Sequence, residues 1–143
     1  MITIGQVMNR QVQAIHCEAT VGEAIESLIE QHTGGAPVVN DAGELVGMIS
    51  ELAMIDVVFD AAVKEARVTK YMTADVHAVQ PSDPLSRAAQ LFALYAFRRL
   101  PVVNDGKLVG IFTRRDLMKH ALRTHQFLTD PLIELFPSLT PTG

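Results

Sequence analysis

A threonine and an aspartate three residues apart, Thr113 and Asp116, stand out in the segment LVGIFTRRDL. If a helix begins near Arg114, its free N–H groups and partial positive charge favour a bound phosphate, and the Thr113 hydroxyl adds a donor. An ionised Asp116 offers only acceptors, which suits the two donors of a ribose diol. Arg114 and Arg115 raise the local positive potential. The four residues are candidates for a nucleotide site, but Thr-x-x-Asp taken alone is more often an ordinary helix-capping pair.

An earlier segment, LVGMISELAM at residues 45–54, carries the same element in altered form. Ser50 keeps the hydroxyl, but Ala53 stands where the acid would be, and Glu51 stands where Arg114 stands in the later segment. A carboxylate beside a phosphate is unfavourable unless a cation or a proton offsets it. This second candidate site is therefore degenerate or suited to a different ligand.

The two segments belong to a longer repeat. APVVND at 36–41 recurs as LPVVND at 100–105, and LVG at 45–47 recurs at 108–110 after the loss of one residue in a turn. Before these motifs, both copies show the i, i+3, i+4, i+7, i+8 apolar spacing of an amphipathic helix. Its positions are Val21, Ala24, Ile25, Leu28 and Ile29, then Leu85, Ala88, Ala89, Phe92 and Ala93.

Each copy predicts the element order β-α-β-β-α, in which two strands joined by a tight turn form a hairpin. One copy is too small to bury its own sheet, so we expect an α+β fold of two repeats packed through their sheets with pseudo-two-fold symmetry. The predicted repeats span 1–65 and 66–124, with residues 66–70 as the connector, and a C-terminal extension spans 125–143.

Capping residues predict where the helices begin and end. Thr20 and Glu23 form a capping box, and the glycines at 34–35 stop the first helix. In the second copy Asp83 is the expected cap, with Pro84 at the first helical position. The second helix of each copy is expected from Leu52 to about residue 65 and from 114 to about 124.

A PVVND hairpin followed by a GIFTRRDL-type segment resembles the cystathionine β-synthase (CBS) domain, and two in tandem resemble a Bateman module. The likeness covers roughly residues 5–124. It implies a regulatory fold without catalysis that binds adenosine-containing ligands in clefts between the two domains. In that pattern the hydroxyl contacts phosphate and the acid holds the ribose.

The resemblance implies which residues line each cleft. The first cleft would contain Thr113, Arg114, Arg115, Asp116, Met8, Val12, Gln13, Gly34, Gly35 and Ala36. The second would contain Ser50, Tyr71, Met72, His77, Arg98, Arg99 and Leu100.

These expectations describe a stand-alone regulator that binds AMP, ADP or ATP and signals to an unidentified effector protein. No cofactor is required, and Mg²⁺ would accompany the ligand only if it is ATP. The alternatives are a ligand-free interaction and dimerisation module, or a sensor of S-adenosylmethionine or a cyclic dinucleotide. A homodimer is expected to form through helices whose small residues allow close approach: Ala61, Ala62, Ala88, Ala89 and Ala93.

Composition argues against several other classes. The net charge of −4 disfavours a large nucleic-acid surface, and no apolar run reaches the ~18 residues that cross a bilayer. Cys17 is the only cysteine, so an intrachain disulfide is impossible, and with no secretion signal we expect a cytoplasmic protein. The five histidines lack metal-site spacing, and no nucleophile with a base is evident, so no catalytic or metal residue is predicted.

The C-terminal segment HQFLTDPLIELFPSLTPTG lies beyond the repeat. Asp130 and Pro131 can begin a short apolar helix, which would pack either on its own module or on a second subunit.

Overall fold

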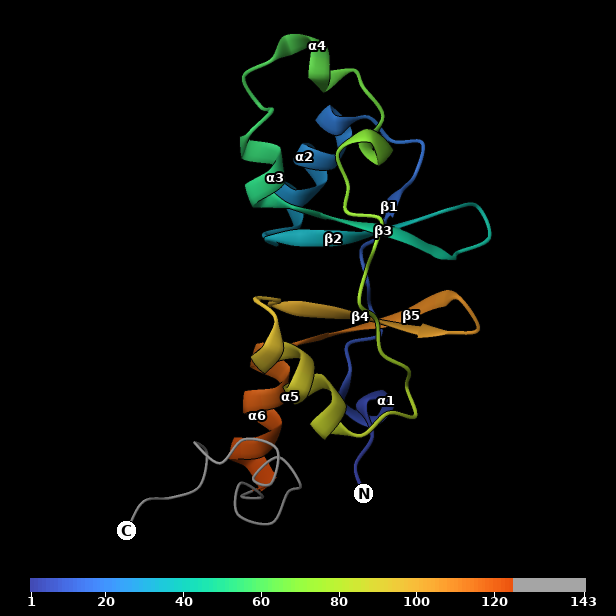
Figure 1. The fold of residues 1–143 in the computed structure, drawn as a ribbon, viewed down its shortest axis with the longest axis vertical. Helices are drawn as coiled ribbons and strands as arrows, with labels where there is room; N and C mark the ends of the chain where they lie inside the picture. Colours follow the sequence, from blue (N-terminus) through green and yellow to red (C-terminus); the bar gives the residue numbers. More distant parts are fainter. Residues whose placement is uncertain (125–143) are drawn as a thin grey trace. The chain divides into compact units, whose positions relative to one another are not determined.

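Apolar strands and amphipathic helices form two small sheets with helices packed on them in this computed structural model, which describes residues 1–124 (Figure 1). The chain divides into two units. Unit 1 contains residues 1–11, 78–104 and the chain from 109 onward, and unit 2 contains residues 12–77 and 105–108. Each unit thus contains the sheet and helices of one repeat and the N-terminal segment of the other. We call these segments, residues 1–11 and 66–77, the arms. The predicted helix near Asp130 lies outside the described residues.

Unit 2 holds the first repeat's sheet. Its elements are β1 (Ile15–His16), α2 (Val21–Gln31), β2 (Gly35–Val39), β3 (Leu45–Ser50), α3 (Glu51–Ile55), α4 (Ala61–Lys64) and the 3₁₀ helix η1 (Val68–Lys70). Strand β2 is central: it pairs in parallel with β1 and antiparallel with β3. Helices α2 and α3 lie on the same face of this sheet and contact each other (Figure 1).

Unit 1 repeats this plan. Its elements are α1 (Ile4–Val7), α5 (Leu85–Leu94), β4 (Arg99–Asn104), β5 (Lys107–Thr113) and α6 (Arg114–Thr124), with the first residues of β5 assigned to unit 2. Strands β4 and β5 form a two-stranded sheet, and Val79 adds a parallel bridge to Val102. Helices α5 and α6 pack together, as α2 and α3 do.

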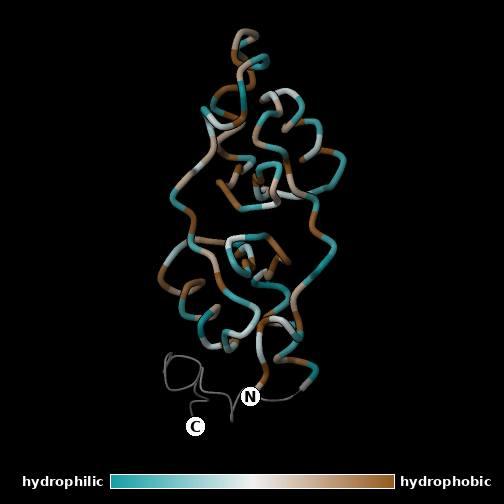
Figure 2. Tube along the Cα trace, turned by 90° about the vertical axis from the view of Figure 1, so that its right-hand side faces the viewer, coloured by the Kyte–Doolittle hydropathy of each residue, from teal (hydrophilic) through white to brown (hydrophobic). Residues whose placement is uncertain are grey.

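Each unit has its own hydrophobic core. The core of unit 2 contains Ile15, Val21, Ala24, Leu28, Ala36, Val38, Ile49, Met54 and Val68. The core of unit 1 contains Ile4, Met8, Val79, Leu85, Ala88, Leu91, Leu100, Val102 and Phe112. The predicted connector is therefore more than a linker, because it contributes the fully buried Val68. Along the helices, hydropathy changes from residue to residue rather than in long apolar runs (Figure 2).

The capping box of α2 is confirmed: the Glu23 N–H donates to Thr20 Oγ1 at 3.1 Å, and the Thr20 N–H donates to Glu23 Oε1 at 3.2 Å. The predicted glycine stop is wrong. Helix α2 ends at Gln31, its C-cap His32 is left-handed with φ 51°, and Gly35 already belongs to β2.

Two further helix predictions are wrong in detail. Pro84 is the N-cap of α5 rather than its first residue, because the Asp83 carboxylate instead accepts the Gln80 N–H at 2.8 Å. The helix expected over residues 52–65 is two short helices. Residues 56–60 read DVVFD and have low helix propensity, and Asp60 caps α4 through the Ala62 N–H at 3.0 Å.

Two of the five alanines expected at a dimer surface lie in the interior. Ala88 and Ala89 are buried within unit 1, since they fall on the inner face of α5. Ala61, Ala62 and Ala93 are exposed. Three of the five alanines are therefore accessible to a second copy, and the two buried ones are not.

Candidate ligand-binding site

The junction between β5 and α6 is closed by a reciprocal cap. Thr113 ends β5, and its N–H donates to Asp116 Oδ2 at 2.9 Å, while the Asp116 N–H donates to Thr113 Oγ1 at 3.1 Å. Both residues are half-buried. The structure therefore brings the predicted hydroxyl and acid together at the N-terminus of an 11-residue helix.

The segment before β4 lies at this same turn. The Arg114 N–H donates to the carbonyl oxygen of Arg98 at 3.1 Å, so Arg98 is a neighbour of the first turn of α6. Arg98, Arg114 and Arg115 are all exposed, so three guanidinium-bearing residues start from backbone positions around one helix N-terminus. The sequence analysis placed Arg98 with Ser50 in the second cleft. That assignment stays a prediction, and the contact with Arg114 is an additional neighbour of Arg98.

The N-terminal arm lies along the outer side of β5. Asn9 and Ile111 exchange two backbone hydrogen bonds, each 2.9 Å long. Met8 is buried beside Gly110, where an added Cβ would lie 2.6 Å from its sulfur. Because Gly110 has no side chain, Met8 packs directly on the strand three residues before Thr113.

Unit 2 contains the corresponding turn with different side chains. Ser50 Oγ accepts the Ala53 N–H at 3.2 Å, and the Glu51 N–H donates to the Gly34 carbonyl oxygen at 2.9 Å. This geometry matches the β5–α6 junction. The side chains differ. Glu51, Gly34 and Ala53 occupy the positions that Arg114, Arg98 and Asp116 occupy in unit 1.

The arm of unit 2 is also equivalent. Met48 and Thr73 exchange backbone hydrogen bonds of 2.9 and 2.8 Å, and Met72 lies over Gly47 as Met8 lies over Gly110.

The remaining predicted residues are distributed as follows. Unit 1 contains Arg99 and Leu100, and unit 2 contains Val12, Gln13, Gly34, Gly35, Ala36, Tyr71, Met72 and His77. Leu100 is 1% exposed and Ala36 3%, so both side chains fill the cores of their units. Participation of residues 12–13 and 34–36 in one site with Thr113 and Asp116 stays a prediction. The second cleft, which groups Ser50 with residues 71–72, 77 and 98–100, stays a prediction too.

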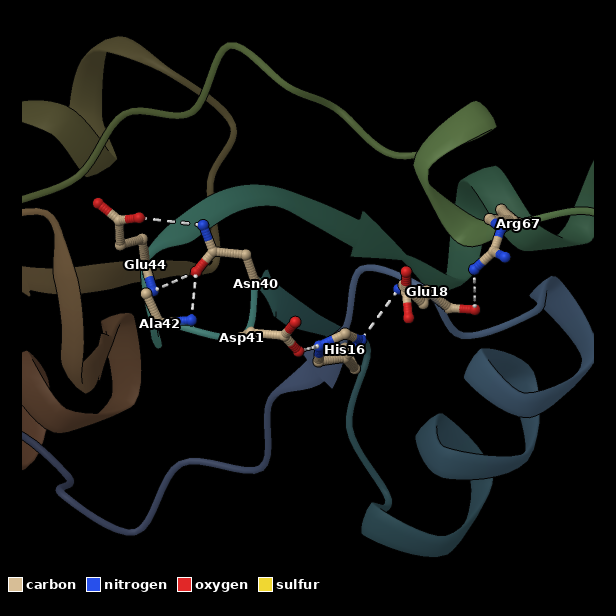
Figure 3. Close-up of polar contacts among 7 residues, drawn as sticks. All are labelled: His16, Glu18, Asn40, Asp41, Ala42, Glu44 and Arg67. Carbon is tan, nitrogen blue, oxygen red and sulfur yellow. Dashed lines mark hydrogen bonds and ion pairs between the residues drawn. The ribbon is translucent and has the colours of Figure 1, made fainter.

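His16 belongs to a polar network within unit 2 (Figure 3). The Glu18 N–H donates to Nδ1 of His16 at 3.1 Å, which assigns the proton to Nε2, and Nε2 in turn lies 2.6 Å from Asp41 Oδ1. Arg67 donates to the Glu18 carbonyl at 3.0 Å. Nε2 thus connects β1 to the β2–β3 turn, while Nδ1 fixes the backbone that follows β1.

Residues 1–124 contain neither a metal-binding cluster nor a membrane-spanning helix. No group of three His, Cys, Asp or Glu side chains in this range is arranged to hold a metal ion. No helix in it combines the length and apolarity needed to cross a bilayer.

The sequence and the fold both have relatives among known proteins. The uncharacterized protein MJ1225 of Methanocaldococcus jannaschii is 35% identical over 116 residues, which are 81% of this chain and 41% of that protein. The chloroplastic CBS domain-containing protein CBSX1 of Arabidopsis thaliana is 30% identical over 152 residues, 85% of this chain and 64% of that protein. The chain thus spans less than two thirds of the length of either relative.

A solved structure of CBSX2 in complex with AMP superposes with a TM-score of 0.80 at 32% identity, covering 87% of this chain and 99% of that one. The CBS domain model matches residues 4–60 and again residues 66–123. These two segments are the two repeats recognised in the sequence, and together they take up most of the chain. The chain therefore belongs to the CBS-domain family and carries two CBS domains in tandem.

Proposed function

We propose that this protein is a regulator that binds an adenosine-containing ligand at the β5–α6 junction and carries out no reaction itself. The similarity to CBSX2, whose structure contains AMP, supports the ligand class. The ligand-contacting residues proposed within unit 1 are Thr113, Arg114, Asp116 and Arg98, with Met8 as the apolar neighbour.

One observation carries the proposal: unit 2 forms the same strand–helix turn without an acid. Ser50 alone caps α3 through the Ala53 N–H, so the fold of this turn does not require a carboxylate. A carboxylate has about four lone-pair sites, and the Thr113 N–H occupies one of those on Asp116. Asp116 therefore keeps acceptor capacity for the two hydroxyl donors of a ribose.

Charge favours phosphate at the same place. The α6 N-terminus carries a partial positive charge, and Arg98 and Arg114 add full charges beside it. At the corresponding turn of unit 2, Glu51 and Gly34 replace these arginines. Because an anion would meet a carboxylate there, we expect one phosphate-containing ligand per chain.

The output is a change in affinity for a partner protein, with the chain acting as a homodimer. A ligand shifts a conformational equilibrium only by its difference in affinity for the two states. The regulated state must therefore differ around the α6 N-terminus, where the ligand binds.

The test is a thermal-shift and calorimetry panel of AMP, ADP, ATP with and without Mg²⁺, and S-adenosylmethionine. Asp116→Asn is the informative variant, since an amide oxygen still caps Thr113 but is a weaker acceptor for a diol. Ser50→Ala is the matched control, because it removes the equivalent cap in unit 2. A ligand at 100 times its Kd stabilises by about 2.7 kcal/mol, or about 9 °C for a chain of this size.

We expect the wild type and Ser50→Ala to show this shift with an adenosine nucleotide and Asp116→Asn to lose most of it. Equal shifts in Asp116→Asn and wild type would refute the site. No shift with any ligand would favour a ligand-free interaction module, the reading in which Thr113 and Asp116 only cap each other.

A further inference from the structure

Helix α6 carries more apolar side chains than its own unit buries. Leu117 packs against the unit 1 core, and Ala121, four residues on, is buried. Met118 and Leu122 are also four residues apart, but they are 60% and 68% exposed. Leu94, on the helix that packs against α6, is 65% exposed as well. A second apolar row of this kind indicates a surface that other residues cover.

A row of positive charge borders the exposed apolar row. Arg115, Lys119 and Arg123 follow one another four residues apart on α6, and all three are exposed. Residues four apart lie on one side of a helix, so the basic row runs beside the apolar row. We call Met118, Leu122, Lys119 and Arg123 together the α6 face.

The chain that follows α6 has the complementary composition. Residues 130–136 read DPLIELF, with two acidic side chains and no basic one. Asp130 and Glu134 are four residues apart, and so are Leu132 and Phe136. If this segment forms the short helix that its sequence predicts, it presents one acidic row and one apolar row.

The exposed apolar side chains of unit 2 do not match this segment in charge. Ile29 and Leu52 are 67% and 75% exposed. Their helices, however, carry four acidic side chains and no basic one: Glu23, Glu26, Glu30 and Glu51. An acidic segment would meet like charges there, which opposes binding.

The connection is long enough for the segment to return to α6. Residues 125–131 span up to about 25 Å when fully extended. The path from residue 124 back to Met118 is about 9 Å along the helix. A segment tethered by so short a connection is present at an effective concentration on the order of 1 mM. At micromolar protein it therefore binds its own α6 face before that of another copy.

We propose that residues 130–136 bind the α6 face of their own chain. The apolar row of the segment covers Met118 and Leu122, and its two carboxylates lie opposite Lys119 and Arg123. A partner protein that binds the α6 face must displace this segment, because the two occupy one surface. The inference goes beyond the proposed function, since no ligand takes part in the contact.

Hydrogen exchange of the full chain without ligand, read by mass spectrometry on peptides spanning 127–136, tests the contact. Asp130→Asn/Glu134→Lys makes the segment basic and keeps a side chain that can cap a helix. Lys119→Glu/Arg123→Glu makes the α6 face acidic. Each should speed exchange in these peptides at least tenfold, and the quadruple variant should restore the protection. Because it carries the same substitutions on α6, its recovery excludes misfolding as the cause.

Phe136→Ser should also remove the protection, because it deletes half of the apolar row of the segment. Ile29→Ser is the matched control: it removes an equally exposed apolar side chain from unit 2 and should leave the protection unchanged. Unprotected peptides in the wild type would overturn the proposal. Protection that survives either charge variant would overturn it too, as would a folded quadruple variant without protection.

Cross-linking identifies the copy to which the segment binds. In a Cys17→Ser background, Lys119→Cys and Glu134→Cys place one thiol on each side of the contact. A short bismaleimide should link the two thiols within one chain, which keeps the product at the single-chain mass of 15.6 kDa. The control pair Glu26→Cys and Glu134→Cys should not link. Failure of the first pair would overturn the proposal. A product of twice the chain mass from a mixture of the two single variants would overturn it as well, because the segment would then lie on another copy.

Discussion

Gly110→Ala should loosen the N-terminal arm from β5. A Cβ at this position would lie 2.6 Å from the Met8 sulfur and 3.0 Å from the Asn9 carbonyl oxygen. Met8 is 9% exposed and packed in the unit 1 core, so its side chain has little room to move away. The Asn9 oxygen is fixed because it accepts the Ile111 N–H at 2.9 Å.

The expected cost follows from these contacts. Overpacking a buried site costs about 1–3 kcal/mol, and weakening the two Asn9–Ile111 hydrogen bonds adds up to about 1 kcal/mol each. Alanine recovers about 0.5–1 kcal/mol relative to glycine in a strand. We therefore expect the free energy of unfolding to fall by about 2–3 kcal/mol, which lowers the urea midpoint by roughly 1–2 M at an unchanged slope.

Gly22→Ala is the matched control. Its Cβ would also meet atoms at short range, Lys64 Cγ at 2.9 Å and the Lys64 carbonyl oxygen at 3.3 Å, but the nearer atom belongs to an exposed side chain that can move. Alanine also favours the α2 helix by about 1 kcal/mol, so the free energy of unfolding should change by less than about 1 kcal/mol. A Gly110→Ala variant within 0.5 kcal/mol of wild type, or a control that costs as much, would refute the argument from close approach.

Two smaller effects can be measured in the same denaturation assay. Thr20→Ala removes the oxygen that accepts the Glu23 N–H and should cost about 1 kcal/mol, whereas Thr20→Ser should retain most of the stability; equal losses would mean that the hydroxyl cap is not the cause. Asp41→Ala breaks the contact with His16. The His16 side chain is 40% exposed and the Asp41 side chain 95%, so the loss should cost less than about 1 kcal/mol. A fall of more than about 2 kcal/mol in the free energy of unfolding would show that the contact between His16 and Asp41 stabilises the fold more than an exposed ion pair does.

The element types could be predicted because local signals and burial agree. The PVV and LVG runs, joined by turns containing Gly43 (φ 79°) and Gly106 (φ 81°), had to form hairpins, and both did. Helix α6 begins at its predicted residue because Thr113 and Asp116 cap its N-terminus within the sequence itself.

Errors occurred where two signals competed over a few residues. Aspartate is a common helix N-cap, but the Asp83 carboxylate accepts the Gln80 N–H instead of an N–H of α5. Two glycines suggested the end of α2, yet His32 adopted the left-handed conformation first, which left Gly35 free to begin β2. Such choices depend on hydrogen-bond partners that a periodic pattern does not identify.

The local part of the candidate site was predictable from the sequence. Thr113 and Asp116 could be named from spacing alone, because their geometry is local. The contact of Arg98 with α6 was not anticipated, because it depends on the hairpin, which folds β4 back so that residue 98 meets the first turn of α6. The same contact exists at Gly34 in the first repeat. A duplicated chain therefore offers its own control: one repeat shows what the fold requires, and any charge found only in the other needs a different explanation. Asp116 and Arg98 are two such charges, and the proposed nucleotide would account for both.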